Sequence, residues 1–405
     1  MKHGMLFVVI LALLSTTTHA AQAPFFPLGL WYEGGVGDVR DHVLPTDPAE
    51  AAKVYERDFA DIEAHGINVI TIPNSPPEHH RLVLDTAQKH NLKVILELGL
   101  DGGSFGHMIR GQRPMDDAAI KAELEKVFAP VKNHPALLRV QLLDEPPGDA
   151  LVRYGLIAEA VRKFDPKMPS FCCLTGDSNG DKFLTDSKSD VIAFDMYPLG
   201  PNVKEGDPKP MKDFATYAQR FADWAEQHKA SSWAVVQCHD ITGQLRLPTA
   251  GEVRCMTYAS LATGNRGVFW FLYQSEHVGQ ALMGGLVDRD SKPRPLWDEV
   301  GKLAKDLAPL SKLLIALKPD RKTQASAGSG ALAYVLRDKE GTAYVFVVNL
   351  DTNQPQKLDI SIEEKAGLRV KSVILDGDMK ADHIGGDVIW HDTLHPGGGV
   401  LYRVE

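Results

Sequence analysis

The chain has 405 residues, of which 44% are hydrophobic and 24% are charged, and its formal net charge is −9. This composition is typical of a folded globular protein and excludes a disordered chain. The sequence contains no long run of Lys and Arg, which argues against nucleic acid or an anionic membrane surface as the main partner. The length fits one barrel domain with a small accessory domain better than it fits two equal halves.

The N-terminal segment has the residue order of a signal peptide. Lys2 and His3 precede an apolar run at residues 5–14, and small and polar residues follow that run. The run is too short to span a bilayer, which takes about 20 apolar residues. We therefore predict a cleaved signal peptide at residues 1–20, no membrane insertion, and a mature protein that is periplasmic or secreted.

Short apolar runs alternate eight times with longer amphipathic segments. Strands that are apolar almost throughout are typical of a parallel sheet that helices cover. Eight such units favour a closed (β/α)8 TIM barrel over an open doubly wound sheet. The expected strands are 28–32, 67–72, 93–98, 138–143, 170–174, 191–195, 233–237 and 267–272. The expected helices are 49–65, 118–132, 150–164, 211–229, 249–263 and 296–317.

The pattern changes after residue 320, where short strands of alternating hydrophobicity replace the strand and helix units. Gly-containing turns separate the short strands, as in an antiparallel β-sandwich. We therefore predict a barrel domain at residues 21–320 and a small C-terminal antiparallel β-sandwich at residues 326–405. The expected strands of the sandwich are 332–337, 343–349, 357–362, 371–375, 388–391 and 399–404.

Carboxylates, amides and aromatic residues recur at the carboxyl ends of the predicted barrel strands, where barrels of this kind carry their active sites. Carboxylates serve acid and base catalysis at glycosidic oxygens, and aromatic faces stack on sugar rings. We therefore expect a carbohydrate substrate. The histidines form no cluster with metal-ligand spacing, so no metal or cofactor is expected. The candidate substrate-binding residues are Trp31, Glu33, Asn74, Asp144, Tyr197, Gln237, His239, Trp270 and Tyr273.

Three stretches of the barrel carry a family resemblance. They are Leu142-Leu143-Asp144-Glu145-Pro146 after the fourth strand, Asp195-Met196-Tyr197-Pro198 after the sixth, and the segments 246–248, 252–264 and 267–273. With these stretches the barrel resembles the clan of retaining (β/α)8 glycoside hydrolases that includes the family 42 β-galactosidases. A sandwich after the barrel is also common in that clan. The resemblance implies a glycoside hydrolase that acts on O-glycosidic bonds.

The resemblance also implies that Glu145 is the general acid/base. Such a role needs a carboxyl whose pKa is raised by a partly apolar site or by a nearby carboxylate, and Asp144 is adjacent. The chain departs from the clan at two positions, because the clan has Asn where this chain has Asp144, and a nucleophilic Glu where this chain has Gln237. An amide cannot form a glycosyl ester, so a retaining mechanism through Gln237 is excluded.

Three explanations of the missing nucleophile remain open. The second carboxylate is displaced, which could give an inverting enzyme with its carboxyls about 6.5–9.5 Å apart. Alternatively, the substrate supplies its own nucleophile, as in hexosaminidases, with Asp144 orienting a 2-acetamido group, Tyr197 contacting its oxygen, and Glu145 as the acid. In the third explanation, the barrel binds a glycan but does not catalyse its hydrolysis. The candidates for the displaced carboxylate are Asp240, Asp195, Glu33 and Glu276, of which Asp240 and Asp195 join Glu145 as the predicted catalytic residues.

Overall fold

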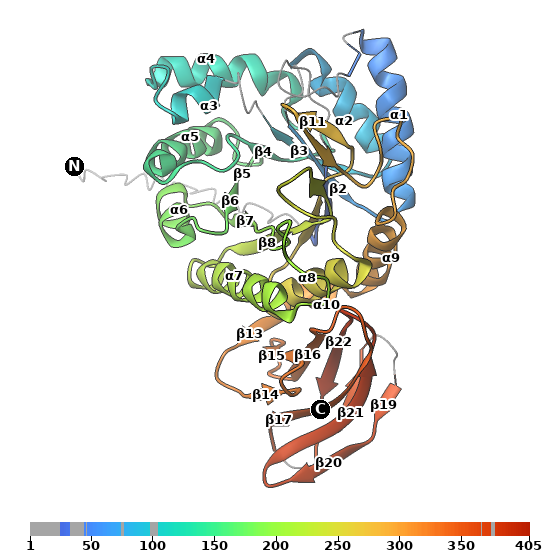
Figure 1. Ribbon diagram of the computed structural model, residues 1–405. Coiled ribbons are helices and arrows are strands. Elements are labelled where there is room, and N and C mark those ends of the chain that lie inside the picture. The colour runs from blue at the N-terminus through green and yellow to red at the C-terminus, as the bar shows by residue number, and fades with distance from the viewer. Residues whose placement is uncertain are drawn as a thin grey trace, which may run out of the picture.

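The structure, a computed structural model, describes residues 25–32, 44–45, 47–73, 77–97, 104–365, 367–373 and 377–405. It consists of a strand barrel surrounded by helices and a smaller β-domain that contains the C-terminus (Figure 1). The predicted fold class, a TIM barrel with a C-terminal antiparallel β-sandwich, is confirmed. Within the described residues, no helix is both long enough and apolar enough to span a lipid bilayer.

Among the described residues, nine parallel strands form the barrel in the order β5-β4-β3-β2-β1-β10-β8-β7-β6. They fill eight positions, because the fifth predicted strand is divided at Cys172 into β5, which pairs with β4, and β6, which pairs with β7. The strands are β1 (Leu28–Trp31), β2 (Val69–Ile72), β3 (Lys93–Glu97), β4 (Leu137–Gln141), β5 (Ser170–Phe171), β6 (Cys173–Thr175), β7 (Val191–Asp195), β8 (Ser231–Gln237) and β10 (Val268–Phe271).

Aromatic side chains fill the interior of the barrel. Phe171 packs against Trp233 with ring centroids 5.6 Å apart, and Trp233 stacks on Phe269 at 5.7 Å. Trp31 contacts Phe171 and Phe269 from the opposite side, at 6.4 Å from each. The barrel is therefore a packed core and not a pore, which restricts any site to the strand ends and the loops that follow them.

Helices cover the outside of the barrel. Asp47 and Asp207 cap the N-termini of α1 and α7, and a proline follows each of them at the first helical position. The helices are α1 (Pro48–Ala64), α2 (His80–Lys89), α3 (Ser104–Ile109), α4 (Asp117–Val127), α5 (Leu151–Phe164), α6 (Gly180–Ser187), α7 (Pro208–Gln227), α8 (Ala250–Ala262), α9 (Trp297–Leu307) and α10 (Ser311–Ala316). Short 3-10 turns are η1 (Pro77–His79), η2 (Ala129–Val131), η3 (Gly148–Ala150) and η4 (Ala308–Leu310).

The observed helices differ from the predicted ones in two respects. Helices α2, α3 and α6 are not among the predicted helices, because they have ten residues or fewer and therefore show few turns of apolar periodicity. The predicted helix 296–317 is divided into α9, η4 and α10. Pro309 lies in η4 and has no N–H to donate to the preceding turn, which explains the interruption.

Two antiparallel sheets form the C-terminal domain, with strand orders β13-β15-β16-β22-β18-β19 and β14-β17-β21-β20. The first strand of this domain pairs with β15 and begins at Lys318, two residues before the predicted end of the barrel domain. The strands are β13 (Lys318–Asp320), β14 (Ala325–Ser326), β15 (Ala331–Arg337), β16 (Ala343–Asn349), β17 (Gln356–Glu363), β18 (Val370–Ser372), β19 (Gly377–Met379), β20 (Ala381–Ile384), β21 (Asp387–Leu394) and β22 (Gly399–Val404).

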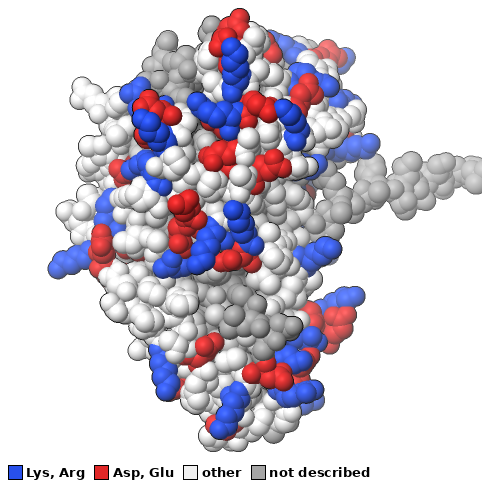
Figure 2. All heavy atoms as spheres, turned by 90° about the vertical axis from the view of Figure 1, so that its right-hand side faces the viewer, with Lys and Arg blue, Asp and Glu red and all other residues white. Residues whose placement is uncertain are grey.

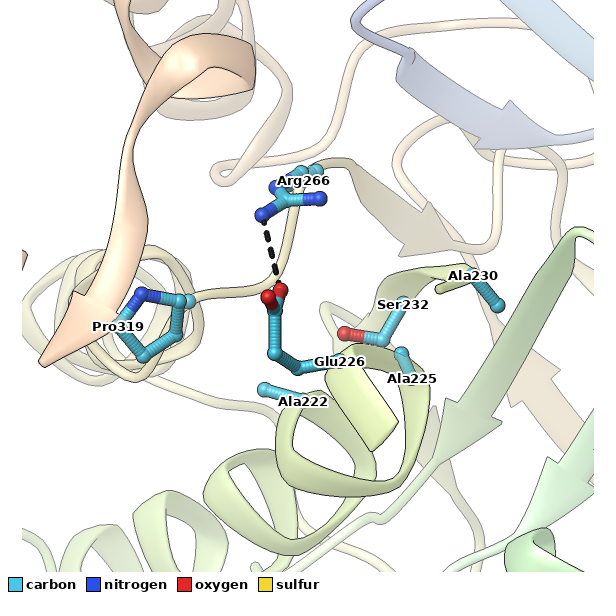
Figure 3. A pocket seen from close by; sticks show the side chains of 8 residues that line it. Ala222, Ala225, Glu226, Ala230, Ser232, Arg266 and Pro319 are labelled. Atoms are coloured by element: carbon cyan, nitrogen blue, oxygen red, sulfur yellow. Dashed lines mark hydrogen bonds and ion pairs between the residues drawn. The ribbon is translucent and has the colours of Figure 1, made fainter. Parts of the chain in front are cut away.

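Helix α8 lies at the junction of the two domains (Figure 1), and nearly all of its residues are buried. Tyr258 on this helix packs against Phe346 of β16 at 6.2 Å between ring centroids, and Arg254 donates to the carbonyl oxygen of Pro396 at 2.9 Å. A recess at the same junction is lined by the end of α7, the amino end of β8 and Pro319, and Arg266 pairs with Glu226 across it at 3.4 Å (Figure 3). This recess lies at the amino end of β8, away from the strand ends that carry the predicted site residues.

Candidate active site

The carboxyl ends of β4, β6 and β7 bring three acidic side chains together. Asp195 is the last residue of β7, while Asp144 and Glu145 follow β4. The backbone N–H of Glu145 donates to the carbonyl oxygen of Cys173 on β6 at 3.1 Å, which fixes the loop after β4 against the neighbouring strand. Asp195 is half-buried and Glu145 is exposed. The two predicted catalytic residues Glu145 and Asp195 are therefore neighbours.

Glu145 has an unusual backbone conformation. Its φ is +43°, in the left-handed region that non-glycine residues rarely adopt. Pro146 follows it, and a residue before proline favours extended backbone. Holding such a conformation costs on the order of 1–3 kcal/mol, and strained residues of this kind cluster at functional sites. The strain thus provides an observation, separate from the family resemblance, that favours a functional role for Glu145.

The Asp195 carboxyl has a pKa well above its ordinary value. Burial is the largest cause, followed by the negative charge of Glu145 and a hydrogen bond between the two carboxyls. The charge of Asp144 raises this pKa further, whereas a hydrogen bond from the Tyr197 hydroxyl lowers it. A carboxyl that is buried beside other carboxylates keeps its proton to a higher pH than an exposed one. Asp195 is therefore a protonated carboxyl next to Glu145 over a wider pH range than an ordinary aspartate.

Two further predicted residues, Tyr197 and His239, lie beside this pair. The Tyr197 ring packs edge-on against the His239 ring at 4.6 Å and lies 5.6 Å from the Phe271 ring. Burial, and then the charge of Asp195, raise the pKa of Tyr197 well above its ordinary value, so its hydroxyl remains a proton donor. The loop that follows β7 thereby places a protonated phenol close to Asp195.

His239 is fully buried, and burial lowers its pKa to about 4. The ring is therefore neutral at physiological pH. Its Nδ1 lies 3.0 Å from the carbonyl oxygen of Phe271, which requires the proton to be on Nδ1. Nε2 is then an acceptor, and it has no hydrogen-bond partner among the described residues. His239 can therefore accept a hydrogen bond beside Tyr197.

Gln237, at the position where the resembled clan has its nucleophile, is buried at the end of β8. Its Oε1 accepts from the N–H of Leu199 at 3.1 Å, and its Nε2 donates to the carbonyl oxygens of His239 at 3.3 Å and Arg246 at 3.2 Å. These backbone bonds occupy both ends of the amide. The structure therefore gives Gln237 a place in the scaffold of the site, and no free amide group for a sugar.

Asp240 and Glu276 lie in a small sheet, β11-β12-β9, formed by the loops after β8 and β10. Its strands are β9 (Asp240–Ile241), β11 (Glu276–Val278) and β12 (Ala281–Gly284). Arg294 forms an ion pair with Asp240 at 2.8 Å, and Glu276 is buried. The Asp240 carboxylate is thus held by a cation, unlike the pair formed by Glu145 and Asp195.

Three predicted sugar-binding aromatics are core residues in this structure. Trp31 lies inside the barrel, and Trp270 points outward, where its Nε1 donates to the hydroxyl of Thr257 on α8 at 3.2 Å. The Tyr273 hydroxyl donates to Asp61 of α1 at 3.0 Å. All three are buried, so none offers an open ring face to a sugar. Glu33 and Asn74 lie outside the described residues.

Cys173 and Phe271 also belong to the site, although no sequence pattern predicted this. Cys173 is a buried thiol whose pKa is raised well above its ordinary value by burial and by the charges of Asp195, Asp144 and Glu145. Phe271 supports the rings of Tyr197 and His239. Both side chains point into the barrel. Side chains along a strand point alternately inward and outward, so the sequence predicts this orientation only when it is known which residues point inward. Among the described residues, no group of three or more His, Cys, Asp and Glu is arranged to hold a metal ion.

A model of a known protein family matches part of the chain. The model of glycoside hydrolase family 42, described as beta-galactosidase, matches residues 152–310, which is less than half of the chain. The matched segment begins just after the loop that carries Glu145 and extends past β10. No curated protein sequence matches the chain. The family match supports the interpretation of the chain as a glycoside hydrolase.

Solved structures of β-galactosidases share the fold. A family 42 β-galactosidase from G. stearothermophilus, in a catalytic mutant form, has a TM-score of 0.63 at 10% identity over 95% of this chain and 99% of its own. A β-galactosidase from Rahnella sp. R3 has a TM-score of 0.63 at 9% identity over 95% and 99%. A β-galactosidase from Halorubrum lacusprofundi has a TM-score of 0.54 at 14% identity over 69% and 58%.

The comparisons confirm the predicted resemblance to the barrel clan that includes family 42. At these identities the structural likeness establishes the fold alone. The chain spans only 58% of the Halorubrum lacusprofundi enzyme and 61% of a β-galactosidase from Marinomonas ef1.

Proposed function

We propose that the protein is an exported glycoside hydrolase in which Glu145 is the general acid/base and Asp195 shares its proton. The observation that carries this proposal is the convergence of Asp144, Glu145 and Asp195 at the carboxyl ends of the barrel strands, where burial and the charge of Glu145 hold the pKa of Asp195 well above its ordinary value. A proton-sharing carboxyl pair can protonate the leaving oxygen of a glycoside and recover the proton from water. The family match supports an O-glycosidic bond as the target, and β-galactosides are the first substrates to test.

Glu145→Gln and Asp195→Asn test this proposal. The purified mature protein would be assayed for sugar release from aryl β-galactosides, other aryl glycosides and polysaccharides. Loss of a general acid typically lowers the rate by about 10²–10⁴-fold, and least for aryl groups that leave without protonation. Glu363→Gln on the exposed side of β17 is the matched control, because it makes the same chemical change outside the barrel. Equal activity of Glu145→Gln and Glu363→Gln would refute the role of Glu145.

A second candidate mechanism is favoured by the surroundings of the two candidate nucleophiles. Asp195 has a raised pKa and keeps its proton to a higher pH, and a protonated carboxyl is a poor nucleophile. The other candidate, Asp240, is ion-paired with Arg294. A substrate with a 2-acetamido group would bring its own nucleophile. Aryl 2-acetamido-2-deoxy glycosides cleaved much faster than their 2-hydroxy counterparts would support this mechanism, and the opposite preference would exclude it.

A glycan-binding barrel without catalysis is the third alternative. It predicts that the folded wild-type protein binds a glycan but releases no sugar, and that Glu145→Gln does not weaken the binding.

Export is a separate part of the proposal. The intact mass of protein recovered from the periplasm or medium after expression of the full chain should correspond to a start at Ala21, and recovery of the uncleaved chain in the cytoplasm would contradict it.

A further inference from the structure

Gln237 connects the loop that follows β7 to the loop that follows β8. The loop after β7 carries Tyr197, and the N–H of Leu199 in that loop donates to Oε1 of Gln237. The loop after β8 carries His239, whose carbonyl oxygen accepts from Nε2 of Gln237. The same Nε2 donates to the carbonyl oxygen of Arg246 further along this loop. One side chain thus sets the positions of both loops relative to β8.

The bonds of Gln237 require an amide. One end of the side chain accepts from a backbone N–H, while the other end donates to two backbone carbonyls. A carboxylate has no N–H to donate, so a glutamate here would bring its negative charge against two carbonyl oxygens in a fully buried site. Gln237 is therefore suited to hold the loops, and a carboxylate in its place would push them apart.

The loops held by Gln237 determine what faces Asp195. Tyr197 precedes Leu199 by two residues, and its ring is fixed between His239 and Phe271. His239 is held in turn by its bond to the carbonyl oxygen of Phe271. Tyr197 and Asp195 affect each other's pKa, so the Tyr197 hydroxyl lies close to this carboxyl. A shift of either loop would move the hydroxyl away from Asp195.

We propose that Gln237 is a positioning residue that holds the Tyr197 hydroxyl beside Asp195 and thereby sets the surroundings of that carboxyl. The proposal rests on the proposed function for its kinetic consequence, but the placement of Tyr197 is independent of catalysis. The proposal also explains why residue 237, at the end of β8, is an amide and not a carboxylate. Gln237 is a structural part of this site, and restoring a glutamate should not restore a retaining nucleophile.

Gln237→Glu and Gln237→Met, made in the full mature chain, test the proposal. Gln237→Met keeps a side chain of similar length and adds no charge. It therefore tests the role of the Gln237 hydrogen bonds even if Gln237→Glu does not fold. Gln244→Glu, at an exposed position in the loop after β8, is the matched control. Two readouts are measured. One is the 19F resonance of Tyr197 in protein labelled with 3-fluorotyrosine, assigned with Tyr197→Phe, and the other is the pH profile of kcat and KM on the responding glycoside.

We expect both Gln237 variants to shift the Tyr197 resonance. We also expect them to lower kcat by on the order of 100-fold with a smaller change in KM, because misplaced catalytic groups cost about that much. The pH profile should move as well, since Asp195 is surrounded by Glu145, Asp144, Cys173 and Tyr197 and responds to each of them. Gln244→Glu should change neither readout.

Two results would overturn the proposal. The first is an unchanged Tyr197 resonance in both Gln237 variants, which would mean that Gln237 does not position Tyr197. The second is a Gln237→Glu variant that is more active than the wild type, which would mean that the carboxylate serves as a nucleophile. If the wild type cleaves no glycoside, the proposed function fails, and the 19F measurement alone then decides whether Gln237 positions Tyr197.

Discussion

Gly397, in the turn before β22, lies so close to Gly251 on α8 that a Cβ at position 397 would overlap the carbonyl oxygen of Gly251. Gly397 also has a φ of +62°, which disfavours any residue with a side chain. The C-terminal domain therefore meets α8 backbone to backbone at this point. Since α8 follows the loop after β8, this contact links the C-terminal domain to the part of the barrel that carries His239.

Gly397→Ala should destabilise the protein by about 2–4 kcal/mol, because it adds an overpacking cost of about 1–3 kcal/mol to the left-handed strain of about 1 kcal/mol. Gly385→Ala is the matched control, since Gly385 has a φ of +63° but open space around its Cβ position. Urea unfolding of both variants separates overlap from strain. Equal losses in the two variants would show that the close approach to Gly251 is relaxed at little cost.

The raised pKa of Asp195 predicts a pH-dependent loss of stability. In the unfolded chain this carboxyl ionises near its ordinary value of about 4, whereas in the folded protein it keeps its proton to a higher pH. Its favourable contribution is complete below the unfolded pKa and is lost as the pH rises through the folded pKa. Asp195→Asn cannot ionise, so it should gain stability relative to the wild type as the pH rises. Thermal unfolding of both proteins from pH 4 to 9 would measure this difference, and a constant difference would contradict the raised pKa.

The proximity of Glu145 and Asp195 could be predicted from sequence, because both follow apolar strands and the carboxyl ends of barrel strands meet at one face. The bonds of Gln237 could not be predicted, because its partners are backbone atoms of two loops whose paths leave no periodic signal. Trp270 illustrates a second difficulty. It lies between Phe269 and Phe271, and since both faces of the strand are aromatic, the sequence does not indicate which set points into the barrel.

The C-terminal domain explains a further feature that the sequence pattern could not resolve. Helix α8 is buried toward the barrel on one side and toward β16 on the other, so it lacks the polar stripe that normally identifies an outward face. The capping box formed by Thr249 and Glu252 fixes where this helix begins. The pattern therefore predicted the position of the helix but not the contact between the two domains.

The low pKa of His239 predicts a loss of stability in acid. The unfolded chain takes up a proton near pH 6.5, whereas the buried ring stays neutral down to a pKa of about 4. The contribution of the neutral His239 ring to the free energy of unfolding is therefore fully present above about pH 6.5. It falls by about 3 kcal/mol as the pH drops toward 4. His239→Asn can still donate to the carbonyl of Phe271 and should remove most of this dependence. His383→Asn on the exposed strand β20 is the control, and a His239→Asn variant with the same acid sensitivity as the wild type would contradict the assignment.

Trp270 distinguishes a core position from a sugar-stacking one. The indole is fully buried, and its Nε1 donates to Thr257 Oγ1 at 3.2 Å. Trp270→Phe should leave KM for any responding glycoside unchanged and lower the free energy of unfolding by about 1–3 kcal/mol, through lost packing and an unpaired Thr257 hydroxyl. Thr257→Val removes the other partner, so the double variant should lose less stability than the sum of the two single variants. A rise in KM without a loss of stability would instead show that Trp270 stacks on the sugar. Such stacking would require β10 to expose the indole ring when substrate binds.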